Sequence, residues 1–94
     1  MNARQQDVNR QIGRFIRRAR RSKDMTLSDL ATAAGLPYWQ LVQKYETGAL
    51  TIPAAKLFDI ANALGMSIQW LFPVGGSLSK NNQTISDDGA RRQA

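Results

Sequence analysis

Apolar side chains recur at helical spacing along most of this chain, in segments that glycine or proline separates. In the first segment, residues 8–22, apolar residues recur at about 100° per residue on one face and arginines fill the opposite face. The apolar positions are Val8, Ile12, Phe15, Ile16 and Ala19. The arginines are Arg10, Arg14, Arg17, Arg18 and Arg21. The pattern predicts an amphipathic first helix, and the polar residues 1–7, which show no period, are predicted to form a flexible N-terminus.

Two shorter helices joined by a tight turn are predicted next. Thr26 suits the N-cap of the first of them, and Gly35 suits its left-handed C-cap. Its buried stripe is predicted to be Leu27, Leu30, Ala31 and Ala34. After a connection at Leu36 and Pro37, the second helix covers residues 38–47. Its inward arc holds Tyr38, Leu41, Val42 and Tyr45, and its outward arc holds Trp39, Gln40, Gln43 and Lys44. This arrangement is typical of a helix-turn-helix.

A fourth helix follows a loop that begins at Gly48. Pro53 is predicted to lie in its first turn, with Thr51 as a nearby cap, and Gly65 is predicted to end it. The predicted buried stripe is Leu57, Ile60, Ala61 and Leu64, with Phe58 at its edge.

A last short helix is predicted over residues 68–72, capped by Ser67 and stopped by Pro73. Its two aromatic residues, Trp70 and Phe72, are assigned first to the core. Residues 75–94 are rich in Gly, Ser, Asn, Gln, Asp and Arg and predict a disordered tail. The expected organisation is therefore one all-α domain over residues 8–74, between a flexible N-terminus and this tail.

The composition narrows the classes of function. The 94 residues suit one compact domain, and 13 Lys and Arg against 7 Asp and Glu give a net charge of +6, which attracts polyanions. The chain has no Cys and no His, which argues against disulfides, thiolate nucleophiles, imidazole bases and the usual zinc sites. Its carboxylates are scattered, so we expect no enzyme, no metal site and no cofactor.

A membrane protein is not expected. No apolar run reaches the roughly 18 residues that span a bilayer, and the polar N-terminus does not resemble a signal peptide. The basic first helix also has the two faces of a membrane-surface anchor, but its apolar stripe is needed for the core. A cytoplasmic protein is therefore expected.

Four groups of residues between positions 12 and 72 form a pattern more specific than helical spacing. They are Ile12-Gly13 with Ile16-Arg17 and Arg20; Met25-Thr26 with Leu30-Ala31 and Gly35; Val42-Gln43-Lys44-Tyr45-Glu46-Thr47-Gly48; and Ile60-Ala61 with Ala63-Leu64-Gly65-Met66-Ser67 and Trp70-Leu71-Phe72. Together they resemble the Cro/cI-type phage repressor helix-turn-helix family of XRE-like transcriptional regulators. The resemblance implies a five-helix, lambda-repressor-like DNA-binding domain that binds double-stranded DNA sequence-specifically, usually as a dimer, and regulates a promoter, most simply as a repressor.

This resemblance makes helix 38–47 the recognition helix in the major groove. Gln40, Gln43 and Lys44 are then base contacts, because Gln pairs with adenine and Lys donates to guanine. Trp39 either contacts a thymine methyl or sugar, or folds back over the turn. Tyr38 lies on the inward arc, which favours core packing, although its hydroxyl can also reach a phosphate. The remaining phosphate candidates are Thr47 and Thr51.

Two departures from the family pattern affect this transfer. The interval from Gly35 to Glu46 is one residue longer than usual, which leaves the register of the turn 35–39 open. Where the family commonly has a phosphate-contacting Gln at the start of the second helix, this chain has Leu27, whose side chain forms no hydrogen bond.

The resemblance also implies an ion pair between Arg20 and Glu46 that orients the recognition helix. Residues 66–74 are the predicted homodimer interface, since their aromatic side chains exceed what so short a helix can bury. An alternative function keeps the fold: an antitoxin-like or adaptor protein whose tail, residues 75–94, binds a protein partner. The low apolar content of the tail argues against a strong interface of that kind.

Overall fold

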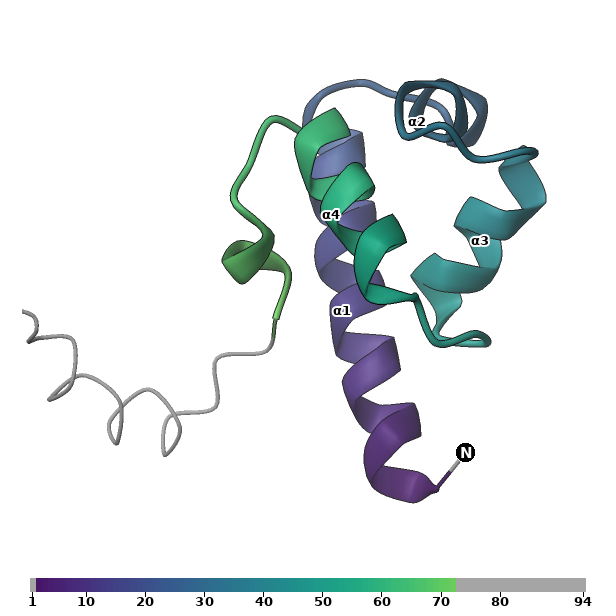
Figure 1. The fold of residues 1–94 in the computed structure, drawn as a ribbon, viewed down its shortest axis with the longest axis vertical. Coiled ribbons are helices and arrows are strands. Elements are labelled where there is room, and N and C mark those ends of the chain that lie inside the picture. Colours follow the sequence, from purple (N-terminus) through teal and green to yellow (C-terminus); the bar gives the residue numbers. More distant parts are fainter. Residues whose placement is uncertain (1, 73–94) are drawn as a thin grey trace, which may run out of the picture.

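The computed structural model describes residues 2–72, and this part of the chain contains helices and no strand (Figure 1). Four α-helices are followed by a short 3-10 helix: α1 (Ala3–Ser22), α2 (Leu27–Ala33), α3 (Trp39–Thr47), α4 (Ala54–Ala63) and η1 (Ile68–Leu71). The all-helical class is confirmed, but the count of five α-helices is not, because the last element is a single 3-10 turn. The predicted stop at Pro73 and the predicted tail lie outside the described residues.

Helix α1 begins five residues before the predicted start at Val8. The side chain of Asn2 accepts a hydrogen bond from the backbone N–H of Gln5 at 2.8 Å, which caps the first turn. Residues 3–7 therefore belong to α1, and the predicted helix start at Val8 is corrected to Ala3. The flexibility of residues 1–7 stays a prediction. Apolar periodicity missed this turn because all of its side chains except Ala3 are polar.

Thr26 caps α2, as predicted. Its hydroxyl accepts a hydrogen bond from the N–H of Asp29, and the Asp29 carboxylate accepts one from the N–H of Thr26, each at 2.9 Å. The backbone N–H of Thr26, helped by its hydroxyl, lowers the pKa of Asp29. Gly35 follows α2 with φ +71°, a left-handed conformation that lets the N–H of Leu36 reach the carbonyl of Ala31 at 2.8 Å.

Predictions at the starts of three helices are corrected. Tyr38 has extended backbone geometry and precedes α3, so the helix starts at Trp39. Pro53 likewise precedes α4, which places Thr51 two residues before the N-cap and too early to cap the first turn. The hydroxyl of Thr51 instead accepts a hydrogen bond from the side-chain amide of Asn9 at 2.9 Å, which ties the α3–α4 loop to α1. Ser67 precedes η1 but forms no side-chain cap.

The predicted apolar stripes of α1, α2 and α4 meet in one core. The residues with almost no exposed surface are Ile16, Leu30, Val42, Ile60, Leu64 and Leu71. In Figure 1, α2 and α3 lie to one side of α1, and η1 lies to the other side.

Three aromatic assignments to this core are wrong. Tyr38 is 56% exposed because it stands outside the helix whose inward arc was predicted to bury it. Trp70 is 64% exposed and Phe72 is 44% exposed, because η1 is short and turns Leu71 inward.

Candidate nucleic-acid interface

Helix α3 has a buried face and an exposed face. Val42, Tyr45 and Glu46 are buried against the rest of the domain. The predicted outward arc is exposed, and it consists of Trp39, Gln40, Gln43 and Lys44. The structure therefore brings these four side chains together on the outer surface of one helix.

A glycine contact fixes how closely α3 approaches α1. A Cβ atom at Gly13 would lie 2.5 Å from the carbonyl oxygen of Tyr45 and still closer to that of Glu46. The backbones of the two helices can touch here only because position 13 has no side chain. Burial also raises the pKa of Tyr45, with a smaller contribution from Tyr38.

The expected ion pair between Arg20 and Glu46 is present, and it is bidentate. Arg20 Nε donates to Glu46 Oε2 at 2.6 Å, and Arg20 Nη2 donates to Glu46 Oε1 at 3.1 Å. Their side chains are only 12% and 5% exposed. Arg20 Nη1 also donates to the carbonyl of Met25 at 2.8 Å. One guanidinium thus joins α1, the α1–α2 connection and α3, a task that suits its planar fork.

The C-terminal end of α3 is held by its own backbone. Gly48 has φ +81°, its N–H donates to the carbonyl of Tyr45 at 3.2 Å, and the N–H of Ala49 donates to that of Lys44 at 2.9 Å. The hydroxyl of Thr47 donates to the carbonyl of Lys44 at 3.2 Å. Of the predicted phosphate contacts, Tyr38 lies exposed before α3 and Thr47 lies exposed at its end, while Thr51 is bonded to Asn9.

Two hollows border α3, and the first of them adds two residues, Ser28 and Thr32, that the sequence analysis did not single out. The first lies between α2 and α3, and its rim includes Ser28, Thr32 and Trp39. Ser28 and Thr32 stand four residues apart on the exposed face of α2, a spacing that was available in the sequence. The second hollow is lined by Arg17, Arg20, Leu27, Gln43, Glu46 and Thr47. Leu27 thus lies beside an exposed arginine of α1.

None of the helices within residues 2–72 is both long and apolar enough to cross a membrane. Over the same residues, no cluster of three or more acidic side chains has the arrangement of a metal site.

The fold and this surface are those of a helix-turn-helix protein. The family model described as helix-turn-helix matches residues 16–71, more than half of the chain. The chain therefore belongs to the helix-turn-helix family, in agreement with its resemblance to XRE-like regulators.

Two curated relatives are named as regulators. An uncharacterized transcriptional regulator in the ATPase CF(0) region of Rhodospirillum rubrum is 35% identical over 65 residues, which cover 69% of this chain and 59% of that protein. An uncharacterized HTH-type transcriptional regulator of Sinorhizobium fredii is 35% identical over 83 residues, 88% of this chain and 54% of that protein. The chain thus spans a little over half the length of each of these relatives.

A solved structure shares the fold. The restriction-modification controller protein C.AhdI from Aeromonas hydrophila superposes with a TM-score of 0.65 at 25% sequence identity. The match covers 67% of this chain and 94% of that one.

Proposed function

We propose that this protein is a sequence-specific regulator of transcription that binds double-stranded DNA with α3 in the major groove. The observation that carries the proposal is the division of α3 into two faces. Its inner face is fixed to α1 at Gly13 and through the Arg20–Glu46 ion pair, while its outer face presents long polar side chains. A rigid helix with an exposed polar face matches the width and chemistry of the major groove.

Gln40, Gln43 and Lys44 are the proposed base contacts. A Gln amide donates to and accepts from the major-groove edge of adenine, and a Lys ammonium donates to the acceptors of guanine. Trp39, 40% exposed at the start of α3, is proposed to contact a thymine methyl group or a sugar.

Phosphate contacts are proposed on both sides of α3. Tyr38 is placed by its extended backbone outside the helix, where its hydroxyl can donate to a phosphate oxygen. Thr47 and Thr51 lie at the other end, and each hydroxyl already has an intramolecular partner. We expect a weaker contribution from Thr47, because a phosphate must compete with the bond that its hydroxyl donates to the Lys44 carbonyl.

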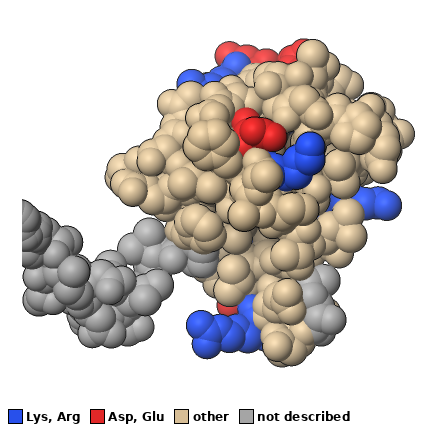
Figure 2. All heavy atoms as spheres, in the orientation of Figure 1, with Lys and Arg blue, Asp and Glu red and all other residues tan. Residues whose placement is uncertain are grey.

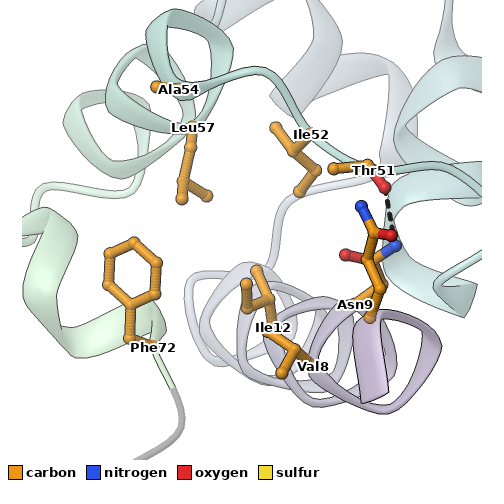
Figure 3. Close-up of a pocket in the computed structure, with 9 residues that line it drawn as sticks. Val8, Asn9, Ile12, Thr51, Ile52, Ala54, Leu57 and Phe72 are labelled. Carbon is orange, nitrogen blue, oxygen red and sulfur yellow. Dashed lines mark hydrogen bonds between the residues drawn. The ribbon is translucent and has the colours of Figure 1, made fainter. Parts of the chain in front are cut away.

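We also propose that the protein acts as a repressor and binds as a homodimer through residues 66–74, of which 73 and 74 lie outside the described residues. Support comes from exposed aromatic side chains around η1 and from an apolar pocket of about 300 Å³ beside it. Figure 3 shows Phe72 and Leu57 facing Val8 and Ile12 across this pocket. Charged side chains are sparse on the face shown in Figure 2. A second copy of the chain suits such a surface better than DNA does.

Selection of duplexes from a random pool tests base readout and dimeric binding together. Wild-type protein is expected to enrich one sequence, arranged as an inverted repeat with half-site centres about 10 base pairs apart. Gln43→Ala is expected to relax the preference at one position of each half-site, since a bidentate contact contributes about 1–3 kcal/mol of discrimination. Gln6→Ala removes an exposed glutamine from the first turns of α1 and serves as the matched control.

Base readout, the homodimer and the role of Gln43 each have their own contradicting result. If the wild-type protein enriched no sequence, the proposal that α3 contacts bases would be contradicted. Enrichment of a single half-site, without its inverted repeat, would contradict binding as a homodimer. An unchanged consensus with Gln43→Ala would leave base readout standing but take Gln43 out of it.

A further inference from the structure

Four arginines cluster on the exposed side of α1. Arg14, Arg17, Arg18 and Arg21 line one open hollow on the helix surface. Arg14 is three and four residues from Arg17 and Arg18, and Arg21 is four and three residues from the same two, so these pairs are neighbours on the helix surface. The cluster lies away from the apolar stripe that packs into the core.

Within residues 2–72 no acidic side chain neutralises this cluster. Asp7 lies 3.8 Å from Arg10, and Glu46 is held by Arg20. The four clustered arginines form no ion pair with any described residue. Like charges four residues apart weaken a helix, as at Arg17 and Arg21. Arg21 gains a favourable interaction with the helix dipole in the last turn of α1, which offsets repulsion of this size. The stability of α1 therefore does not explain why four arginines gather on one face.

The cluster continues into the proposed DNA-binding surface. Arg17 lines the arginine hollow and also the hollow that contains Leu27, Gln43 and Thr47. A ligand that reaches Gln43 in a groove therefore passes close to Arg17. A membrane surface fits less well, because Ile12 and Ile16 of the same helix are buried in the core and cannot insert into lipid.

From this continuity we infer that the α1 arginine cluster (Arg14, Arg17, Arg18 and Arg21) binds the phosphate backbone of the duplex next to the bases contacted by α3. The inference rests on the proposed DNA-binding function and enlarges its footprint. Arg17 provides the contact nearest to α3, on the side where Leu27 offers no hydrogen bond. The other three extend it along the flanking DNA, independently of sequence.

The test replaces Arg17 and Arg21 together by Gln and measures affinity by fluorescence anisotropy over a range of salt concentrations. Arg4→Gln/Lys23→Gln removes the same charge elsewhere: Arg4 is in the first turn of α1, and the Lys23 ammonium points toward Gly65. Each duplex is either long, with the enriched sequence at its centre, or trimmed to that sequence. The Arg17/Arg21 variant should fold about as stably as wild type, because the lost like-charge repulsion and the lost interaction of Arg21 with the helix dipole have opposite signs.

On the long duplex, affinity should fall less steeply with salt for the Arg17/Arg21 variant than for wild type. The negative slope of log affinity against log salt should shrink in magnitude by about 2, since each phosphate contact contributes about 0.9. The control pair should change it much less, and the ratio of specific to scrambled affinity should stay constant. If both double variants lost the same amount of salt dependence, the inference would be overturned, because the arginines would then act only through the net charge of the protein. An unchanged slope would overturn it as well. So would an Arg17/Arg21 variant that keeps its affinity for DNA and loses only its binding to phosphatidylglycerol vesicles. If wild type shows no sequence preference, the proposed function fails, yet the two pairs can still be compared on any duplex.

Discussion

Replacing Arg20 by Ala is expected to lower the free energy of unfolding by about 3 kcal/mol, a large share of the roughly 5–15 kcal/mol that stabilises a small domain. The reason is the carboxylate left behind. Glu46 is 5% exposed, and both of its oxygens accept hydrogen bonds from Arg20. Without the guanidinium, a buried charge loses its partner, and the carbonyl of Met25 loses a donor. Urea unfolding followed by circular dichroism measures the change.

Companion variants separate this effect from lost packing. Glu46→Ala should destabilise less than Arg20→Ala, because Arg20 keeps its bond to Met25 and its long side chain can reach water. The double variant should be more stable than Arg20→Ala alone, since it leaves no orphaned carboxylate. Arg20→Lys should restore only part of the stability, because an ammonium cannot form the two parallel bonds. An Arg20→Ala variant as stable as wild type would show that the pair does not hold α3 in place.

The second large effect is expected at Gly13. In a solvent-exposed helix position, Gly→Ala would stabilise the protein by about 0.5–1 kcal/mol. At Gly13 the new methyl group would meet the backbone carbonyls of Tyr45 and Glu46, which cannot move aside as a side chain can. Overpacking of this kind costs about 1–3 kcal/mol or more. We therefore expect net destabilisation of about 2 kcal/mol by Gly13→Ala, together with weaker DNA binding as α3 is displaced.

An exposed site on the same helix provides the reference for Gly13. The difference in unfolding free energy between Arg18→Gly and Arg18→Ala gives the helix-propensity term alone, because Arg18 is exposed in the middle of α1. The change from Gly to Ala should raise the free energy of unfolding at position 18 and lower it at position 13. If Gly13→Ala instead stabilises the protein to the same extent, α1 and α3 do not approach each other as described.

Patterning predicted the helices whose stability depends on a buried stripe. The core positions Ile16, Leu30 and Ile60 were all placed correctly, because each belongs to an apolar series with helical period. The cap at Thr26 was predicted because Thr is a preferred N-cap residue and stands directly before the apolar series of α2.

Features that depend on contacts distant in sequence were not predictable in this way. The bond between Asn9 and Thr51 joins residues 42 apart, and no local signal distinguishes it from a helix cap at Thr51. The early start of α1 depends on Asn2 and a polar first turn, which apolar periodicity does not detect. The exposure of Trp70 follows from the shortness of η1, and size and hydrophobicity alone argued for burial.

The candidate site shows the same division. The outward arc of α3 follows from the helical period, so the sequence alone is enough to place Gln43 and Lys44 on it. Arg20 and Glu46 were paired only through the family resemblance, because they stand 26 residues apart. The contact of Gly13 with α3, and the position of Arg17 beside Gln43, depend on how the helices pack together, which no local pattern encodes.

The central claim is that α3 contacts bases and does not merely attract phosphates. The most direct test is a fluorescence-anisotropy titration of wild-type protein against the enriched duplex and a scrambled duplex of equal length, at low and at physiological salt. Because salt weakens phosphate contacts in both duplexes alike, we expect the enriched duplex to bind more than about a hundredfold tighter, and this ratio to persist at the higher salt concentration. Equal affinities that vanish together as salt rises would contradict the claim.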